Sequence, residues 1–345
     1  MAGAMRRPAR IVAALLALLV LVPVAGAAKP APNWAQKEIA AVVAAGLLAS
    51  DAASFHPDDA LTRGELAELV TALTGLEQPT PASPAATVTL AELDTRLVRA
   101  LQLQDVTASF NAAARAAGLA PPARFGAEVV ARLLGLRLNH PAPQDAIEPK
   151  PNDPVTRAEA AFSAARILGL RGSERDAVRA AAATFVLPAL TPRQQQVLKR
   201  ALSFVGFPYV WGGESEHKTG PYGPQLQGGF DCSGFVWRVY KLQAFPDAPS
   251  LPATLKGRTT YAMSGEVARP LRIAFDDLQP GDVVFFGAKG PASKPAQVDH
   301  MGIYVGAGWL AHSSSSGTTL VPLEGWYRQR FAWARRPLAE AGLDP

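Results

Sequence analysis

The sequence has little of what several classes of protein require. Its 345 residues include one cysteine and five histidines. A single cysteine excludes an intrachain disulfide and a zinc site built on several thiolates. No GxxxxGK[ST] loop occurs, and no GxGxxG opens a helix, so the common phosphate-binding motifs are absent. We therefore expect no metal and no cofactor.

Charge is also sparse, because charged residues make up 18% of the chain and apolar residues 48%. An apolar share this high can bury sizeable cores, and the length suggests about two domains. The formal charge of +5 includes three arginines within residues 1–27 and no acid there. Without that segment the net charge is +2, which is too small to indicate a nucleic-acid-binding protein.

Residues 1–27 have the three-part plan of a secretory signal peptide. Arg6, Arg7 and Arg10 precede an apolar run, Ile11 to Val24, and the small residues 25–27 follow. The run has 14 residues, fewer than the ~20 of a spanning helix. We expect cleavage, a secreted or wall-associated protein and no stable membrane span. An uncleaved anchor is the alternative.

The first half of the chain is rich in alanine, and three of its segments predict the start of a helix. In each, a threonine is followed three residues later by a glutamate and then by apolar residues at helical spacing. These capping boxes begin at Thr62, Thr89 and Thr156. Their recurrence suggests internal repeats, although the spacings are uneven.

The segments NWAQKEIAAVVAAGLL (33–48) and FHPDDALTRGELAELV (55–70) resemble an S-layer homology module. The resemblance is good over 33–76 and fair over 152–170. It implies a helical domain over 28–172 that binds secondary polymers of the bacterial cell wall. The alternative is a degenerate helical spacer that positions the second half. We expect a linker over 173–190 and a new domain from the helix start at Thr191-Pro192.

Cys232 stands at a chemically distinctive position in the second half. The apolar spacing of residues 235, 236 and 239 predicts a helix, and Asp231 is a suitable N-cap. The cysteine then lies in the first turn, where the helix dipole favours an anion, so we expect a lowered thiol pKa. A thiolate is a competent nucleophile.

Two histidines flank a predicted hairpin. Short apolar strands surround Gly306-Ala307-Gly308, so His300 and His312 should face each other within about one residue of register. His300 could take the proton of Cys232, and His312 could hold the useful tautomer of His300.

The segments YVWGG (209–213), FDCSGFVWRVY (230–240), LQPGDVVFF (278–286), DHMGIYVGAG (299–308) and LAHSS (310–314) together resemble the NlpC-type cell-wall cysteine peptidases. The resemblance covers about 191–336 and implies a papain-like α+β domain, followed by a tail at 337–345. It implies Cys232 as nucleophile, His300 as general base and acid, and His312 as orienting residue. Tyr209 would lie beside the cysteine, while Asp231 and Ser233 would help to hold the substrate.

The same resemblance implies a substrate, the peptidoglycan stem peptide, cut between D-γ-glutamate and a diamino acid. The long loops 214–229 and 287–298 would border the cleft, with further wall from 246–272. The alternatives are an amidase or acyltransferase with the same residues, or a catalytically silent wall-binding protein.

Overall fold

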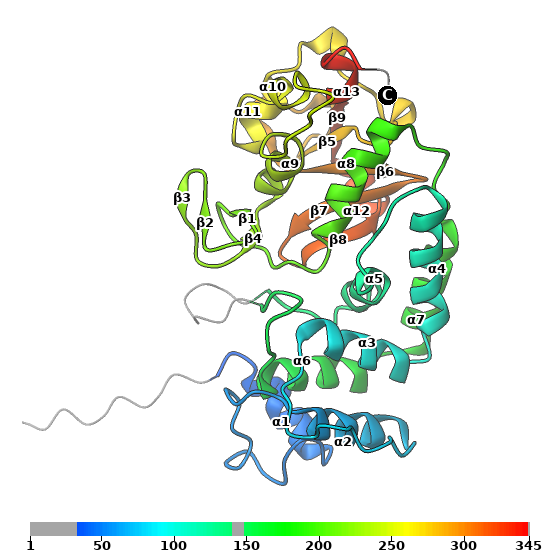
Figure 1. Cartoon of the computed structure of the whole chain (residues 1–345), viewed down its shortest axis with the longest axis vertical. Coiled ribbons are helices and arrows are strands. Elements are labelled where there is room, and N and C mark those ends of the chain that lie inside the picture. Colours follow the sequence, from blue (N-terminus) through cyan, green and yellow to red (C-terminus); the bar gives the residue numbers. More distant parts are fainter. Residues whose placement is uncertain (1–32, 140–147, 344–345) are drawn as a thin grey trace, which may run out of the picture. The chain divides into compact units, whose positions relative to one another are not determined.

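A computed structural model of the protein describes residues 33–139 and 148–343 (Figure 1). The predicted signal segment 1–27 lies outside the described residues. Within those ranges, no helix has the length and apolar character needed to cross a membrane.

The first half is helical, as predicted. Its helices are α1 (Gln36–Ala44), α2 (Arg63–Thr74), α3 (Leu90–Ala100), α4 (Gln104–Ala116), α5 (Phe125–Leu133), α6 (Arg157–Leu168) and α7 (Gly172–Thr184). All three predicted threonine N-caps are present: Thr62, Thr89 and Thr156 accept from the backbone N–H of Glu65, Glu92 and Glu159. The reciprocal bond of a capping box is present at Thr62, whereas the Glu92 carboxylate pairs with Arg63 at 2.9 Å.

The three helix starts are joined to one another by a ring of backbone hydrogen bonds. Leu61 N–H donates to the Val155 carbonyl, Val155 N–H to Val88, and Val88 N–H to Leu61, each at 2.9 Å. All three side chains are fully buried. The ring satisfies backbone groups that the short connections would otherwise leave unpaired in the core. It relates α2, α3 and α6 as three repeated units, in agreement with the repeats expected from the sequence.

The segment 173–190, expected as a linker, lies largely in α7. Just after α7, the buried Phe185 ring packs 5.2 Å from Phe110 and 5.3 Å from Trp309, measured between ring centroids. The predicted domain boundaries stay a prediction. The segment 337–345, expected as a tail, contains helix α13 (Pro337–Glu340), and its Leu338 is buried.

The second half combines helices with a five-stranded antiparallel sheet of order β8-β7-β6-β5-β9. The strands are β5 (Val283–Gly287), β6 (Val298–Gly306), β7 (Trp309–Ser314), β8 (Gly317–Pro322) and β9 (Phe331–Arg335). The helices are α8 (Pro192–Ser203), α9 (Cys232–Tyr240), α10 (Leu251–Thr254), α11 (Thr260–Gly265) and α12 (Gly325–Arg330). Short 3-10 turns are η2 (Arg269–Leu271), η3 (Phe275–Asp277), η4 (Gly290–Ala292) and η5 (Pro295–Gln297).

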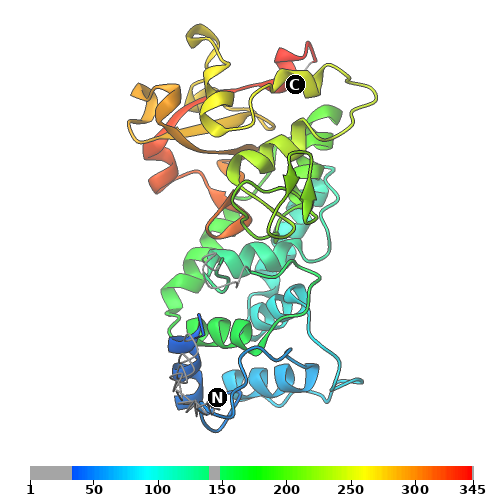
Figure 2. The ribbon, with the colours of Figure 1, turned by 90° about the vertical axis from the view of Figure 1, so that its left-hand side faces the viewer.

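Helix α9 lies against the sheet and contacts β6 and β7 (Figures 1 and 2). Its apolar side chains Phe235, Val236 and Val239 are fully buried, which fixes the helix through burial of apolar surface. The predicted helix and hairpin are therefore confirmed, as is the α+β class of the chain.

The loop 214–229 folds into two short hairpins. These pair β1 (Glu214–Ser215) with β4 (Gly229–Phe230), and β2 (Thr219–Gly220) with β3 (Gly223–Pro224). Strand β4 leads directly into the start of α9, so the position of this loop is tied to that of the cysteine-bearing helix.

Candidate active site

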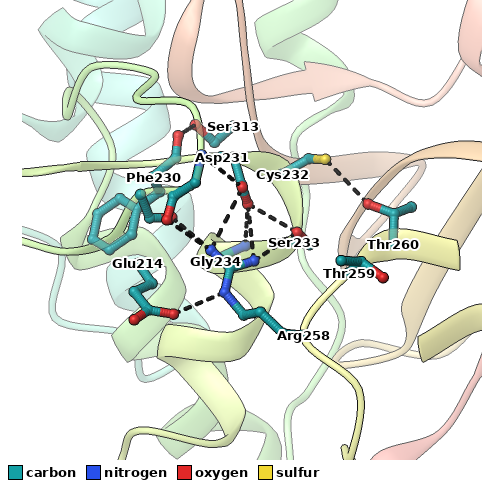
Figure 3. A network of polar contacts seen from close by, with 12 residues as sticks. Glu214, Phe230, Asp231, Cys232, Ser233, Gly234, Arg258, Thr259, Thr260 and Ser313 are labelled. Atoms are coloured by element: carbon teal, nitrogen blue, oxygen red, sulfur yellow. Dashed lines mark hydrogen bonds and ion pairs between the residues drawn. The ribbon is translucent and has the colours of Figure 1, made fainter. Parts of the chain in front are cut away.

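Cys232 is the first residue of α9 and is held there by its neighbours (Figure 3). The Asp231 carboxylate caps the helix by accepting from the Gly234 N–H. The preceding Phe230 carbonyl accepts from the Ser313 hydroxyl of β7 at 2.7 Å. These bonds fix the first turn of α9 against the sheet. The N–H of Cys232 itself donates to no acceptor among the described residues, as expected for a first-turn amide.

Cys232 is 9% exposed, and its thiol lies 3.4 Å from the Thr260 hydroxyl, between Sγ and Oγ1. Burial raises the pKa of this thiol, while the Thr260 hydroxyl and the backbone N–H groups of Ser233 and Met301 lower it in part. The expectation of a lowered pKa from the helix dipole was therefore wrong. Desolvation disfavours the thiolate more strongly than the helix start favours it.

His300 and His312 form a direct hydrogen bond, with 2.8 Å between His300 Nε2 and His312 Nδ1. The tight turn between β6 and β7 has positive φ at Ala307 and Gly308 (52° and 77°), which suits a two-residue hairpin turn. A bulge after Tyr304 shifts the register.

Gly306 pairs with Trp309, and beyond the bulge Ile303 pairs with Ala311, so His312 lies opposite Gly302, two residues from His300 rather than one. A side chain at Gly302 would meet His312: its Cβ would lie 2.9 Å from the His312 Cβ. The glycine therefore leaves room for the His312 ring to reach His300 diagonally across the hairpin.

Both histidines are neutral in the free protein. Burial lowers the pKa of His300 to about 4, with Asp299 opposing and Arg330 reinforcing the effect. Burial also lowers the pKa of His312 well below its usual value, and the neighbouring His300 adds to the shift. Since the thiol pKa is raised, the free protein holds Cys232 as a neutral thiol beside a neutral His300, with no thiolate–imidazolium ion pair.

The structure brings the three predicted catalytic residues to one region, but it joins only two of them directly. No hydrogen bond links Cys232 to His300 in the described ranges; the sulfur reaches β6 at the N–H of Met301, the residue after His300. Catalytic hydrogen bonds are often long or misaligned without substrate. His300 Nε2 is occupied by His312, so Nδ1 is the nitrogen available to the thiol.

Tyr209 lies near enough to Cys232 for the two side chains to influence each other electrostatically. It forms a backbone bridge to Phe230. Burial raises the pKa of Tyr209, and repulsion from the Cys232 thiolate, which forms only at high pH, and from Asp231 raises it further. The phenol therefore keeps its proton and can act as a hydrogen-bond donor next to the sulfur.

The predicted substrate contacts Asp231 and Ser233 are held by Arg258 (Figure 3). The Arg258 guanidinium donates to Ser233 Oγ at 2.8 Å and pairs with Asp231 at 3.3 Å and with Glu214 at 2.8 Å. It also donates to the carbonyls of residues 212 and 213. Asp231 accepts further bonds from the Gly212 N–H and the Ser233 hydroxyl, so its oxygens are fully engaged within the protein.

Three residues at this site were not predicted from the sequence: Thr260, Arg258 and Tyr327. Thr260 and Arg258 lie within 246–272, the stretch expected to form cleft wall, but no spacing singles them out. Tyr327 of α12 lies 3.3 Å from His312, between Oη and Nε2. Within the described ranges, no cluster of three or more His, Cys, Asp or Glu side chains could hold a metal ion.

The second half of the chain is similar in sequence to known peptidases. Over 149 residues the chain is 28% identical to the gamma-D-glutamyl-L-lysine dipeptidyl-peptidase of Bacillus subtilis, covering 42% of each protein. It is 34% identical over 136 residues to the bifunctional muramidase/DL-endopeptidase CwlT of the same organism, covering 39% of this chain and 33% of the relative. The chain thus spans less than half the length of the curated relatives it matches.

A crystal structure of an NlpC/P60 family protein from Bacillus cereus matches 43% of this chain and 41% of its own, with 26% identity and a TM-score of 0.32. The S-layer homology family model matches residues 28–67, so the later helix starts lie beyond it. The NlpC/P60 family model matches residues 206–336, within the predicted 191–336. The chain thus carries an NlpC/P60 family domain preceded by an S-layer homology domain.

Proposed function

We propose that the protein is a cysteine-type peptidoglycan hydrolase that cuts amide bonds in stem peptides. The observation that carries the proposal is the hydrogen-bonded pair His300–His312 on β6 and β7 beside the helix start that holds Cys232. All three residues lie in the segment that matches the NlpC/P60 family.

The reaction begins with the thiol turning from Thr260 toward His300 Nδ1. Because the free protein holds a neutral thiol and a neutral imidazole, proton transfer accompanies attack rather than preceding it. The sulfur bonds to the scissile carbonyl carbon while its proton moves to His300. His300 then gives that proton to the leaving amine, and a thioester to Cys232 remains.

Water completes the cycle. His300 takes a proton from the water as its oxygen attacks the thioester carbonyl, and the sulfur leaves with the proton returned. The oxyanion of each tetrahedral intermediate would be bound by the unpartnered Cys232 N–H and the Tyr209 hydroxyl. Such donors contribute roughly 3–4 kcal/mol each in comparable sites.

We further propose the amide between D-γ-glutamate and a diamino acid as the scissile bond. The support is the name of a relative, the gamma-D-glutamyl-L-lysine dipeptidyl-peptidase of Bacillus subtilis. Asp231 and Ser233 would act on the substrate by shaping the wall that Arg258 holds, since the Asp231 oxygens already accept bonds from Gly212, Ser233 and Gly234.

Residues 28–172 would bind secondary cell-wall polymer and keep a secreted protein at the cell surface. The S-layer homology match over 28–67 supports this, together with the three repeated helix starts. Sedimentation of the full chain with intact walls, and its loss with walls stripped of secondary polymers, would test it. Equal sedimentation with both would contradict polymer binding.

Defined stem peptides that are still attached to their sugar test the enzymatic proposal. Digestion should release a diamino acid with a newly free α-amine, identified by mass spectrometry. In ¹⁸O-labelled water, the new glutamate carboxylate should carry one labelled oxygen. Cleavage between the sugar lactyl group and L-alanine would indicate an amidase, and an unlabelled product joined to an amine would indicate an acyltransferase.

A further inference from the structure

Tyr327 of α12 packs directly on the histidine pair but has no part in the scheme above. Its ring centroid lies 5.2 Å from that of His312, nearly perpendicular, and 5.5 Å from that of Phe286. Its hydroxyl lies 3.3 Å from His312 Nε2. These contacts aim the hydroxyl at the one nitrogen of His312 that His300 does not occupy.

The two neighbours of His312 determine where its proton can be. When His300 carries the thiol proton, both of its ring nitrogens bear hydrogens, so its Nε2–H must donate to His312 Nδ1. Neutral His312 then holds its own proton on Nε2. The side chain is fully buried, and Tyr327 Oη is the acceptor present for that N–H within the described residues.

We propose that Tyr327 is a positioning residue whose hydroxyl oxygen accepts from His312 Nε2–H and so fixes the tautomer that makes His300 a base. The inference rests on the proposed function. In the opposite tautomer His312 would present Nδ1–H to His300, which would have to accept at Nε2 and hold its proton on Nδ1. That nitrogen could not then take the proton of Cys232.

The test compares Tyr327→Phe with Tyr304→Phe as a matched control. Tyr304 is also half-buried in this part of the domain, but its hydroxyl accepts from the Gly308 N–H and touches neither histidine. Because Tyr327 acts through His312, its loss should lower kcat 10- to 100-fold and change KM less than twofold. Tyr304→Phe should change kcat less than threefold.

A second readout does not depend on turnover. In ¹⁵N spectra of the unmutated protein, His312 should be protonated at Nε2, and His300 at Nε2 with a free Nδ1. Tyr327→Phe should lose this pure His312 tautomer, while Tyr304→Phe keeps it. The charges facing His300, Asp299 of β6 and Arg330 of α12, are unchanged in both variants.

The outcomes separate the two proposals. If the unmutated protein cleaves nothing, the proposed function fails while the tautomer measurement still decides the role of Tyr327. His312 protonated at Nδ1 in the unmutated protein would overturn the inference. So would equal kcat values for the two phenylalanine variants.

Discussion

Replacing Gly302 by alanine should disable the histidine pair without touching it chemically. A Cβ at this position would lie 2.7 Å from the Ala311 carbonyl oxygen, 2.9 Å from the His312 Cβ and 3.0 Å from a Leu310 methyl group. Ordinary contacts begin near 3.4 Å, so the two strands must separate by several tenths of an ångström. The nearest obstacle is backbone, which cannot rotate away.

Two magnitudes follow from this clash. Overpacking a well-packed core costs about 1–3 kcal/mol of folding free energy. Displacing a catalytic group by about 1 Å can lower the rate about 100-fold. Gly302→Ala should therefore lower the free energy of unfolding by about 1–3 kcal/mol and kcat/KM by roughly 10- to 100-fold, with kcat carrying most of the loss.

Gly265→Ala is the matched control, because its added Cβ would meet only Pro295 at 3.5 Å, an ordinary contact. Urea denaturation and steady-state cleavage of a stem peptide measure both variants. Wild-type kcat/KM in a folded Gly302→Ala variant would refute the placement of His312 across from Gly302 and its importance for His300.

Three further predictions concern the charges and the thiol. Arg258→Met should lower the free energy of unfolding by about 3 kcal/mol in urea denaturation, because it leaves the buried Glu214 without its ion-pair partner. The double variant with Glu214→Gln should recover part of that loss. Additive losses in the double variant would contradict the pairing. Thr260→Val should move the pH dependence of iodoacetamide alkylation of Cys232 to higher pH, since the Thr260 hydroxyl lowers the thiol pKa. Thr260→Ser keeps the hydroxyl and should not. A shift to lower pH in Thr260→Val would contradict the hydrogen bond between Thr260 and Cys232. The acidic limb of kcat/KM should lie near pH 4, because cleavage needs neutral His300 and the pKa of His300 is about 4. Asp299→Asn should move the limb to lower pH and Arg330→Gln to higher pH, because Asp299 raises this pKa and Arg330 lowers it. A limb near pH 6.5 would contradict the burial of His300.

Much of the site could be predicted from local pattern. The N-cap at Asp231, the first-turn position of Cys232 and the hairpin that carries the histidines each depend on residues close in sequence. The helix starts in the first half were likewise predictable from threonine and glutamate at fixed spacing. That spacing did not predict that Glu92 would pair with Arg63 instead of with its own N-cap.

The remaining features depend on tertiary contacts that a sequence does not display. The thiol pKa was mispredicted because Cys232 is buried in the folded chain, and burial depends on packing between segments far apart in sequence. The hairpin register was off because the turn residues are Ala307 and Gly308, which places His312 opposite Gly302. Arg258 is 26 residues from Cys232 along the chain, and Tyr327 is 27 residues from His300. No motif marks either residue.

The measurement that tests the central claim most directly is digestion of purified peptidoglycan by the protein and by its Cys232→Ala variant, with soluble fragments identified by mass spectrometry. Thermal unfolding of both proteins controls for folding. The account predicts fragments ending at D-glutamate from the unmutated protein and none from the folded variant. The same fragments from Cys232→Ala, or none from the unmutated protein, would contradict it.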